Sequence, residues 1–273
     1  MKTLSFVKLD SCVLGEFNPL KAVSAAPLFT FSVGAHKIVV SNHMFMITLA
    51  TVILVVLLFA SLRSPKIIPK GIQNLIEMIC VYLREQMARP VLGEHTDQFI
   101  CFIWTIFFFV LSLNLLAMIP LDMIIYLVSG KPNHLSGDAT ANIWITGGLA
   151  IITFFTVHIA GIRKQGLWHY IANFAPKVPL LLVPFVYFLE VIGSFVRPFA
   201  LAVRLFANML AGHTLLAALL GLILIFKNYG VAFVSVTAIV AISFLELFVA
   251  FLQAYIFAFL STVYISFSVS QEH

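Results

Sequence analysis

Residues 178–226 read VPLLLVPFVYFLEVIGSFVRPFALAVRLFANMLAGHTLLAALLGLILIF, and these 49 residues hold only three charged side chains, Glu190, Arg197 and Arg204. A second stretch, residues 228–271, has 44 residues and a single charge, Glu246. As a helix, either stretch would extend about 65–75 Å, which is roughly twice the hydrocarbon thickness of a bilayer. Each stretch must therefore be either two membrane spans or one long helix that lies strongly tilted.

No polar turn near residue 203 or residue 250 would let the chain reverse inside either stretch. Pro198 alone favours a kink over a hairpin. We therefore expect two long, tilted helices that form a hairpin with its turn near residues 227–230. The amino-acid composition agrees with a membrane location, because the 273-residue chain is 62% apolar and only 10% charged. Soluble domains are about 25% charged, so a cytosolic enzyme and a disordered chain are both excluded.

Apolar runs of bilayer-crossing length also cover residues 45–62, 99–119 and 143–162, and the two long helices are placed at residues 178–226 and 230–268. Between the first two spans, residues 71–89 carry apolar side chains at helical spacing opposite charged ones. This pattern predicts an amphipathic helix on the membrane surface or against a partner. The expected fold class is an all-α polytopic membrane protein with about five spans and one interfacial helix. Residues 1–42 form an outer amino-terminal segment, and residues 43–273 form a single membrane domain.

Basic residues predict the orientation of these spans. They gather in the loops after the first and third spans, namely Arg63, Lys66, Lys70, Arg163, Lys164 and Lys177. Since positively charged loops stay on the cytoplasmic or matrix side, we expect the amino terminus outside and the carboxy terminus inside. No removable signal peptide is evident. The three cysteines are too scattered for a disulfide framework or a metal site.

The few charges of the carboxy-terminal third recur at helical spacing. Glu190, Arg197 and Arg204 are seven residues apart and share one helix face, which Asn208 extends by one turn. His213 lies about 180° around the same helix, while Glu246 and Gln253 are again seven apart on the last helix. A charged side chain at the bilayer centre costs about 2.5–3.5 kcal/mol on insertion scales. These residues therefore face protein or water and are candidate functional residues.

Their chemistry is typical of a proton path with an electrostatic gate. Arg204 cannot release its proton, but it can lower the pKa of a nearby carboxylic acid by about 1–3 units. Histidine and glutamate can accept and release protons in a wet cavity. Small residues on the same helix would suit another helix sliding past, namely Ala207, Ala211 and Gly212. Glu190 and Arg197 could instead form a structural ion pair. His158 is expected to be a hydrogen-bonded packing residue.

Residues 197–213, RPFALAVRLFANMLAGH, closely resemble the signature of subunit a of the F-type ATP synthase membrane sector. Residues 252–257 and the carboxy-terminal SQEH are further matches. Asn114 with the leucines after it, residues 119–122 and residues 141–142 look like the second and third spans of that family. The resemblance covers the chain from about residue 40 to its end.

The resemblance implies a proton-translocating stator beside a rotating ring of c subunits, held by the b subunits of the peripheral stalk and surrounded by lipid. Protons would enter by one half-channel, ride on a ring carboxylate and leave by another. Arg204 would keep that carboxylate ionised and block a direct leak. The matched outer half-channel positions are Asn208, His213, Glu246 and Gln253, while Glu190 matches the inner exit path. Supporting positions are Arg197, Asn114, Asp122 and Asn142.

The resemblance implies no cofactor, metal or nucleic acid for this chain and no site for ATP chemistry. A bacterial plasma membrane is the expected location, with an organelle inner membrane as the alternative. Some family members carry Glu at the position of His213 and His at that of Glu246, so the pair is exchanged here. Some also carry an Asp where this chain has Ala117, a charge that Asp122 could replace.

Two other classes of function fit the sequence less well. A self-contained secondary transporter usually has two related halves with broken helices at corresponding positions, and this sequence shows no internal repeat. An inert assembly scaffold leaves the lone arginine at lipid depth unexplained. The proton-path interpretation accounts for both observations, and it requires a carboxylate from another chain.

Overall fold

The computed structural model describes residues 27–33, 36–62, 71–119, 139–172, 182–226 and 228–269. Asp122, Lys177, the basic residues at 63–70 and the first 26 residues lie outside the described residues. The elements in chain order are β1 (Pro27–Val33), β2 (His36–Ser41), α2 (Asn42–Leu62), α3 (Ile72–Tyr82), η3 (Leu83–Ala88), α4 (Arg89–Leu92), η4 (Gly93–His95), α5 (Thr96–Ala117), η5 (Ala139–Ala141), α7 (Ile143–Gln165), α8 (Leu167–Ala172), α9 (Val183–Phe226) and α10 (Tyr229–Val269).

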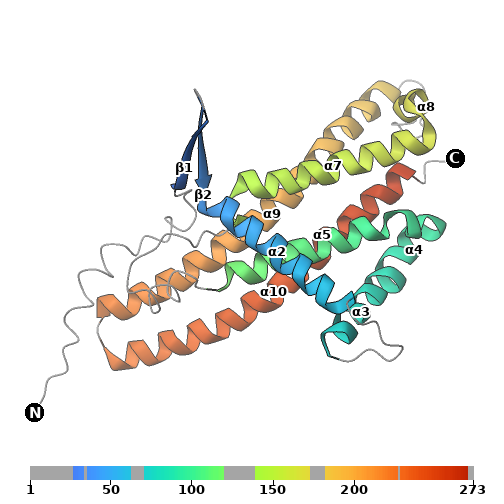
Figure 1. Ribbon diagram of the computed structural model, residues 1–273. Helices are drawn as coiled ribbons and strands as arrows, with labels where there is room; N and C mark the ends of the chain where they lie inside the picture. The colour runs from blue at the N-terminus through green and yellow to red at the C-terminus, as the bar shows by residue number, and fades with distance from the viewer. Residues whose placement is uncertain are drawn as a thin grey trace, which may run out of the picture.

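Five helical stretches of the described chain are long and apolar enough to cross a membrane, with α3 to α5 counted as one of them. The all-α polytopic class predicted from the sequence is confirmed. A feature that the sequence reasoning did not predict is the short antiparallel hairpin of β1 and β2, which pairs Val33 with His36 and lies directly before the first span. It adds to the helical fold without entering the helix bundle (Figure 1).

The two charge-poor stretches are each one continuous helix, α9 with 44 residues and α10 with 41. At 1.5 Å per residue they extend about 66 Å and 62 Å. The alternative of two spans per stretch is therefore wrong, and Pro198 lies inside α9 without ending it. Asn228 accounts for the sharp turn between the helices, because its side-chain oxygen accepts a hydrogen bond from the Gly230 amide at 2.9 Å. The helices then run antiparallel, side by side (Figure 1).

The predicted amphipathic helix at residues 71–89 is present and continues to Leu92 through the π-helical segment η3. It packs on the chain itself, since Ile76, Leu83 and Met87 are buried in the same cluster as residues of α5 and α10. Hydrogen bonds fix it there. The Trp104 indole donates to the Cys80 carbonyl at 3.1 Å, and the Ser266 hydroxyl donates to the Val91 carbonyl at 2.7 Å.

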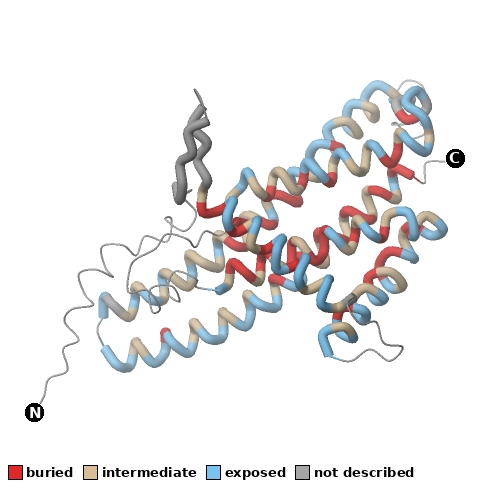
Figure 2. Tube along the Cα trace, viewed as in Figure 1, coloured by how far each residue is buried: buried red, intermediate tan, exposed pale blue. Residues whose placement is uncertain are grey.

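The core lies between α5 and α10, where Figure 2 shows buried residues along both helices. Three fully buried alanines on α10 recur every fourth residue, at positions 250, 254 and 258. Small side chains at this spacing let α5 approach closely. The faces of α9 and α10 away from this core are covered with exposed phenylalanines, among them Phe185, Phe199, Phe233 and Phe248. Apolar surface on this scale is what a lipid-facing protein presents.

Gly161 lets α7 pack closely against α8 and α10. A Cβ at this position would overlap the Ser268 hydroxyl of α10 and would lie 2.5 Å from an atom of the Tyr170 ring of α8. Tyr170 is buried, so it has little room to move away. On the same helix, a Cβ on Gly148 would meet nothing within 4 Å. The two glycines therefore form a matched pair for testing this packing.

Gly161→Ala should lower the thermal unfolding midpoint of the detergent-solubilised protein, because overpacking a filled site costs about 1–3 kcal/mol. Gly148→Ala should leave the midpoint unchanged or raise it, since alanine is the better helix former by about 1 kcal/mol. Scanning fluorimetry of both variants checks the difference. Equal midpoints for the two variants would contradict the close contact of α7 with Tyr170 and Ser268.

Candidate functional site

Arg204 lies near the middle of α9 with its side chain exposed, although its neighbours Leu201 and Leu205 are buried in the core with residues of α5 and α10. Among the residues that the structure describes, no carboxylate forms an ion pair with it; the four ion pairs there involve other arginines. A guanidinium keeps its proton at physiological pH. Arg204 is therefore a permanent positive charge, in an apolar helix, that this part of the chain leaves unneutralised.

The other two charges of α9 neutralise each other. The Arg197 guanidinium lies 2.5 Å from the Glu190 carboxylate, and both side chains are about one-third exposed. Arg197 also stands over the Tyr264 ring of α10, with 5.9 Å between the guanidinium carbon and the ring centroid. The ion pair left open by the sequence is thus formed. Because it removes one negative and one positive charge, Arg204 alone carries the net charge of this helix face.

His213 and Glu246 come together across α9 and α10. The Glu246 carboxylate packs against Gly212, where any Cβ would overlap it, and it interacts electrostatically with the neighbouring His213 ring. Both side chains are half-buried, as is Asn208 one turn after Arg204. Gly212 therefore makes the close approach of an acid and an imidazole possible. These are two groups that can exchange protons.

Asn114 and Gln253 place polar groups inside the core between α5 and α10. Asn114 is fully buried and donates a hydrogen bond to the Ala250 carbonyl at 3.4 Å, while Gln253 is 3% exposed. Within the described chain, the Asn114 side-chain oxygen and the Gln253 side-chain nitrogen have no hydrogen-bond partner. Leaving a buried polar atom unpaired costs about 1–3 kcal/mol. Both side chains keep capacity for a further polar partner.

The remaining predicted positions are less informative. Asn142 caps the start of α7, since its side-chain oxygen accepts from the Trp144 amide at 3.0 Å, which is a structural task. Ala117 packs with Ala141 and Met209, joining the end of α5 to α9. Asp122 lies outside the described residues, so its relation to Ala117 stays a prediction. Among the described residues, no group of three or more His, Cys, Asp or Glu side chains is placed to hold a metal ion.

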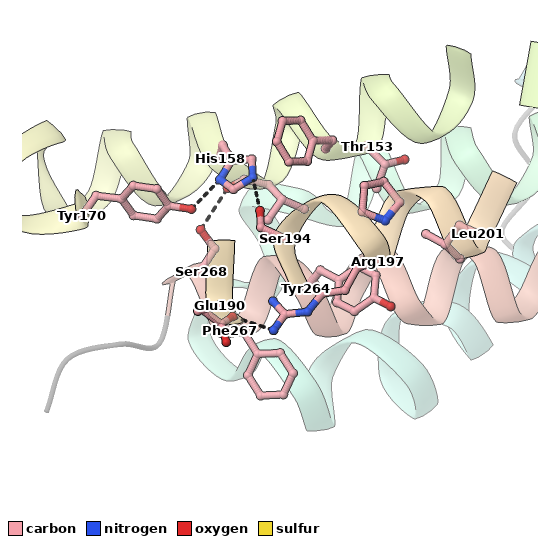
Figure 3. Close-up of a pocket in the computed structure, with 13 residues that line it drawn as sticks. Thr153, His158, Tyr170, Glu190, Ser194, Arg197, Leu201, Tyr264, Phe267 and Ser268 are labelled. Carbon is pink, nitrogen blue, oxygen red and sulfur yellow. Dashed lines mark hydrogen bonds and ion pairs between the residues drawn. The ribbon is translucent and has the colours of Figure 1, made fainter. Parts of the chain in front are cut away.

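The sequence reasoning missed a polar cluster where α7, α8, α9 and α10 meet (Figure 3). His158 lies at its centre, with the Tyr170 hydroxyl 2.6 Å from Nδ1 and the Ser194 hydroxyl 2.8 Å from Nε2. The cluster lines a cavity of about 50 Å³ that the Glu190–Arg197 pair also borders. His158 was expected to be a packing residue. Its hydrogen bonds agree with that, but its partners on other helices could not be read from spacing.

Along α9 these groups fall on both sides of Arg204. Glu190, Ser194 and Arg197 precede it by 14, 10 and 7 residues, or about 21, 15 and 10 Å. On the other side, Asn208 and His213 follow it by 4 and 9 residues, or about 6 and 14 Å. The arrangement is a fixed cation between two polar regions, and each region holds a side chain that can accept and release a proton, Glu190 in one and His213 in the other. Such an arrangement can hold an anion at the middle while protons reach it from either side.

A sequence profile described as ATP synthase A chain matches residues 43–266. The chain is 38% identical over 267 residues to ATP synthase subunit a of Myxococcus xanthus (strain DK1622), with 93% of this chain and 84% of the relative aligned. It is also 38% identical over 266 residues to ATP synthase subunit a of Chloroherpeton thalassium, covering 94% of this chain and 74% of the relative. ATP synthase subunit a of Chlorobium phaeobacteroides (strain BS1) is 34% identical over 271 residues, covering 97% and 75%.

Proposed function

The chain belongs to the ATP synthase A chain family, and we propose that it is the proton-translocating stator subunit of the F1Fo complex. In this role it gives a rotating c-subunit ring two offset half-channels that reach the ring from opposite sides of the membrane. Proton flow through them drives rotation and ATP synthesis elsewhere in the complex. The chain is an integral membrane protein, and bacterial relatives favour a bacterial inner membrane as its location.

The observation that carries this proposal is the unneutralised, exposed Arg204 between two proton-exchanging regions. When a ring helix passes, its acidic side chain comes to lie beside this positive charge and can become its negative partner. A neighbouring cation lowers the pKa of a carboxyl group by about 1–3 units, which corresponds to about 1.4–4 kcal/mol in favour of the ionised form. The ring carboxylate therefore gives up its proton when it reaches Arg204, and it must be protonated again before it returns to lipid.

The surface beside Arg204 supports contact with a moving helix. The exposed residues around it on α9 are small, since Ala200, Ala207 and Ala211 form one stripe with it. Small side chains let a second helix approach and slide past. The same fixed charge repels a free proton from the ring interface. Arg204 therefore separates the half-channels as well as holding the ring carboxylate ionised.

The two polar regions supply the half-channels. On the outer side we place Asn208, His213, Glu246 and Gln253, with Asn114, Asp122 and Asn142 in supporting positions. On the inner side we place Glu190, with Arg197 as its counter-ion at 2.5 Å. The b subunits of the peripheral stalk hold the chain against the torque of the ring.

Arg204→Ala should abolish ATP synthesis driven by an imposed proton gradient and should allow passive proton leak, because nothing then ionises the ring carboxylate or separates the half-channels. Membrane vesicles containing the assembled complex provide the assay. Arg89→Ala is the matched control, since Arg89 is an exposed arginine paired with Glu85 outside the proposed path. Proton-driven synthesis by an assembled Arg204→Ala complex would refute the proposal.

Exchanging the residues at 213 and 246 together should preserve more ATP synthesis than either single change. The double variant His213→Glu with Glu246→His keeps one acid and one imidazole against Gly212, whereas each single variant leaves two like groups facing each other. Rates are compared at equal complex content. A double variant slower than both single variants would show that the two side chains do not work as a pair.

A further inference from the structure

The cavity at the junction of α7, α8, α9 and α10 has a wall of proton-exchanging groups that the proposed function does not yet use (Figure 3). Its volume of about 50 Å³ is room for one or two water molecules. Glu190, Arg197 and Ser194 of α9 line it together with Tyr170 of α8 and Ser268 of α10. His158 of α7 lies between Ser194 and Tyr170.

The side chains across this cavity form a continuous hydrogen-bonded chain. Ser194 Oγ is 2.8 Å from His158 Nε2, and His158 Nδ1 is 2.6 Å from the Tyr170 hydroxyl. The Tyr170 hydroxyl lies beside Ser268, whose own hydroxyl donates to the Val157 carbonyl at 2.9 Å. Every member of this chain except the imidazole is a hydroxyl, which can donate and accept at the same time. A proton can therefore pass from Ser194 through His158 to Tyr170, and Ser268 is the last hydroxyl of this hydrogen-bonded chain, because its own proton goes to a backbone carbonyl.

The His158 ring makes hydrogen bonds in addition to the contacts that hold it by packing. Phe154 contacts the ring edge-to-face, with 4.1 Å between the ring centroids, and this contact alone would serve packing. Both ring nitrogens are nevertheless bonded to hydroxyls on two different helices. The charged and titratable groups facing the ring are Glu190 and Arg197 from α9, Tyr170 from α8 and Tyr264 from α10.

The position of this hydrogen-bonded chain along the helix bundle shows which way it would carry a proton. Its Ser194 end lies on α9 beside the Glu190–Arg197 pair, about 15 Å along the helix from Arg204. Its Tyr170 end lies on α8, which follows the last turn of α7 with Arg163 and Lys164. Basic residues of this kind mark the inner side of a membrane protein. The hydrogen-bonded chain thus lies on the inner side of Arg204 and leads towards the inner end of the bundle.

We propose that His158 is the proton-relay residue of the inner half-channel, carrying protons from the Glu190 side of the cavity to Tyr170 and Ser268. This rests on the proposed function and names new members of its exit path. A proton released by the ring carboxylate reaches His158 Nε2 through Ser194 and cavity water, while the proton on Nδ1 leaves to the Tyr170 oxygen. Tyr170 passes its own proton to water beside Ser268 at the inner end of the cavity. One proton enters and one leaves, and the imidazole regains its starting tautomer by exchange with cavity water, which gives a proton to Nδ1 and takes one from Nε2.

Two substitutions test the relay in the complete ATP synthase in membrane vesicles. His158→Gln keeps a side chain that can bond on both sides but cannot carry an extra proton, and Tyr170→Phe removes only the hydroxyl. Each should slow gradient-driven ATP synthesis by about 100-fold or more, the lower end of what a positioned proton-transfer group contributes. Thr156→Val is the matched control, because the Thr156 hydroxyl donates to the Ile152 carbonyl of the same helix. Its rate of ATP synthesis should stay within about twofold of the wild type.

Chemical rescue separates a relay from a structural role. His158→Gly leaves space for a free imidazole. Added imidazole should therefore raise the rate of ATP synthesis by this variant at least about fivefold at constant complex content. The same imidazole should not help Tyr170→Phe, which still lacks the next acceptor. A slow, assembled His158→Gly complex without rescue would mean that His158 only packs, and it would overturn the relay.

The outcomes also distinguish the relay from the function on which it rests. Near wild-type rates in both His158→Gln and Tyr170→Phe, together with loss of synthesis in Arg204→Ala, would overturn the relay and leave the stator function standing. Retained synthesis in Arg204→Ala would instead overturn the stator function itself. Should His158→Gln fail to assemble, Tyr170→Phe decides by the same rate criterion, because it keeps the buried ring.

Discussion

A guanidinium that cannot lose its charge, on a helix that must lie in lipid, is the constraint on which the rest of this molecule depends. Arg204 is exposed on α9, and no carboxylate of the described chain pairs with it. The nearest negative charge on its own helix, Glu190, is already taken by Arg197 at 2.5 Å. The free energy cost of this charge in hydrocarbon is therefore not met by a carboxylate of the described chain, and water or the acid of a partner can meet it. In the proposed stator function, each ring carboxylate would offset that cost as it passes Arg204.

One side of α9 packs tightly against the helical core, and the other side, which carries Arg204, is exposed. Helices α5 and α10 form the core through alanines at every fourth position, and the buried Leu201 and Leu205 attach α9 to that core. The opposite side of α9 keeps a stripe of small exposed residues beside Arg204. Gly212 and Gly161 let polar groups approach the backbone closely, the Glu246 carboxylate at one and the Ser268 hydroxyl at the other. Each glycine thus lies beside one of the two polar regions that flank the arginine.

The features that follow from one helix's own periodicity could be predicted from the sequence. The two long helices follow from their scarcity of charge, and the i,i+7 spacing places Glu190 and Arg197 close enough to pair. Features that depend on contacts between distant segments could not be predicted in this way. The His158 cluster joins residues 158, 170, 194 and 268 from four helices, and no local pattern links them. The β1–β2 hairpin and the π-helical η3 segment were missed because short strands and single extra residues leave almost no periodic signal.

The central claim, that a ring helix passes the exposed side of α9 at Arg204, is tested most directly by cross-linking within the assembled complex. With the native cysteines Cys12, Cys80 and Cys101 replaced by serine, Ala207→Cys presents a thiol on the exposed stripe and Met209→Cys presents one on the buried side. A second cysteine is placed beside the ion-binding carboxylate of the ring subunit. The account predicts a disulfide to the ring from position 207 and none from position 209 under mild oxidation. A cross-link from position 209, or none from position 207, would contradict it.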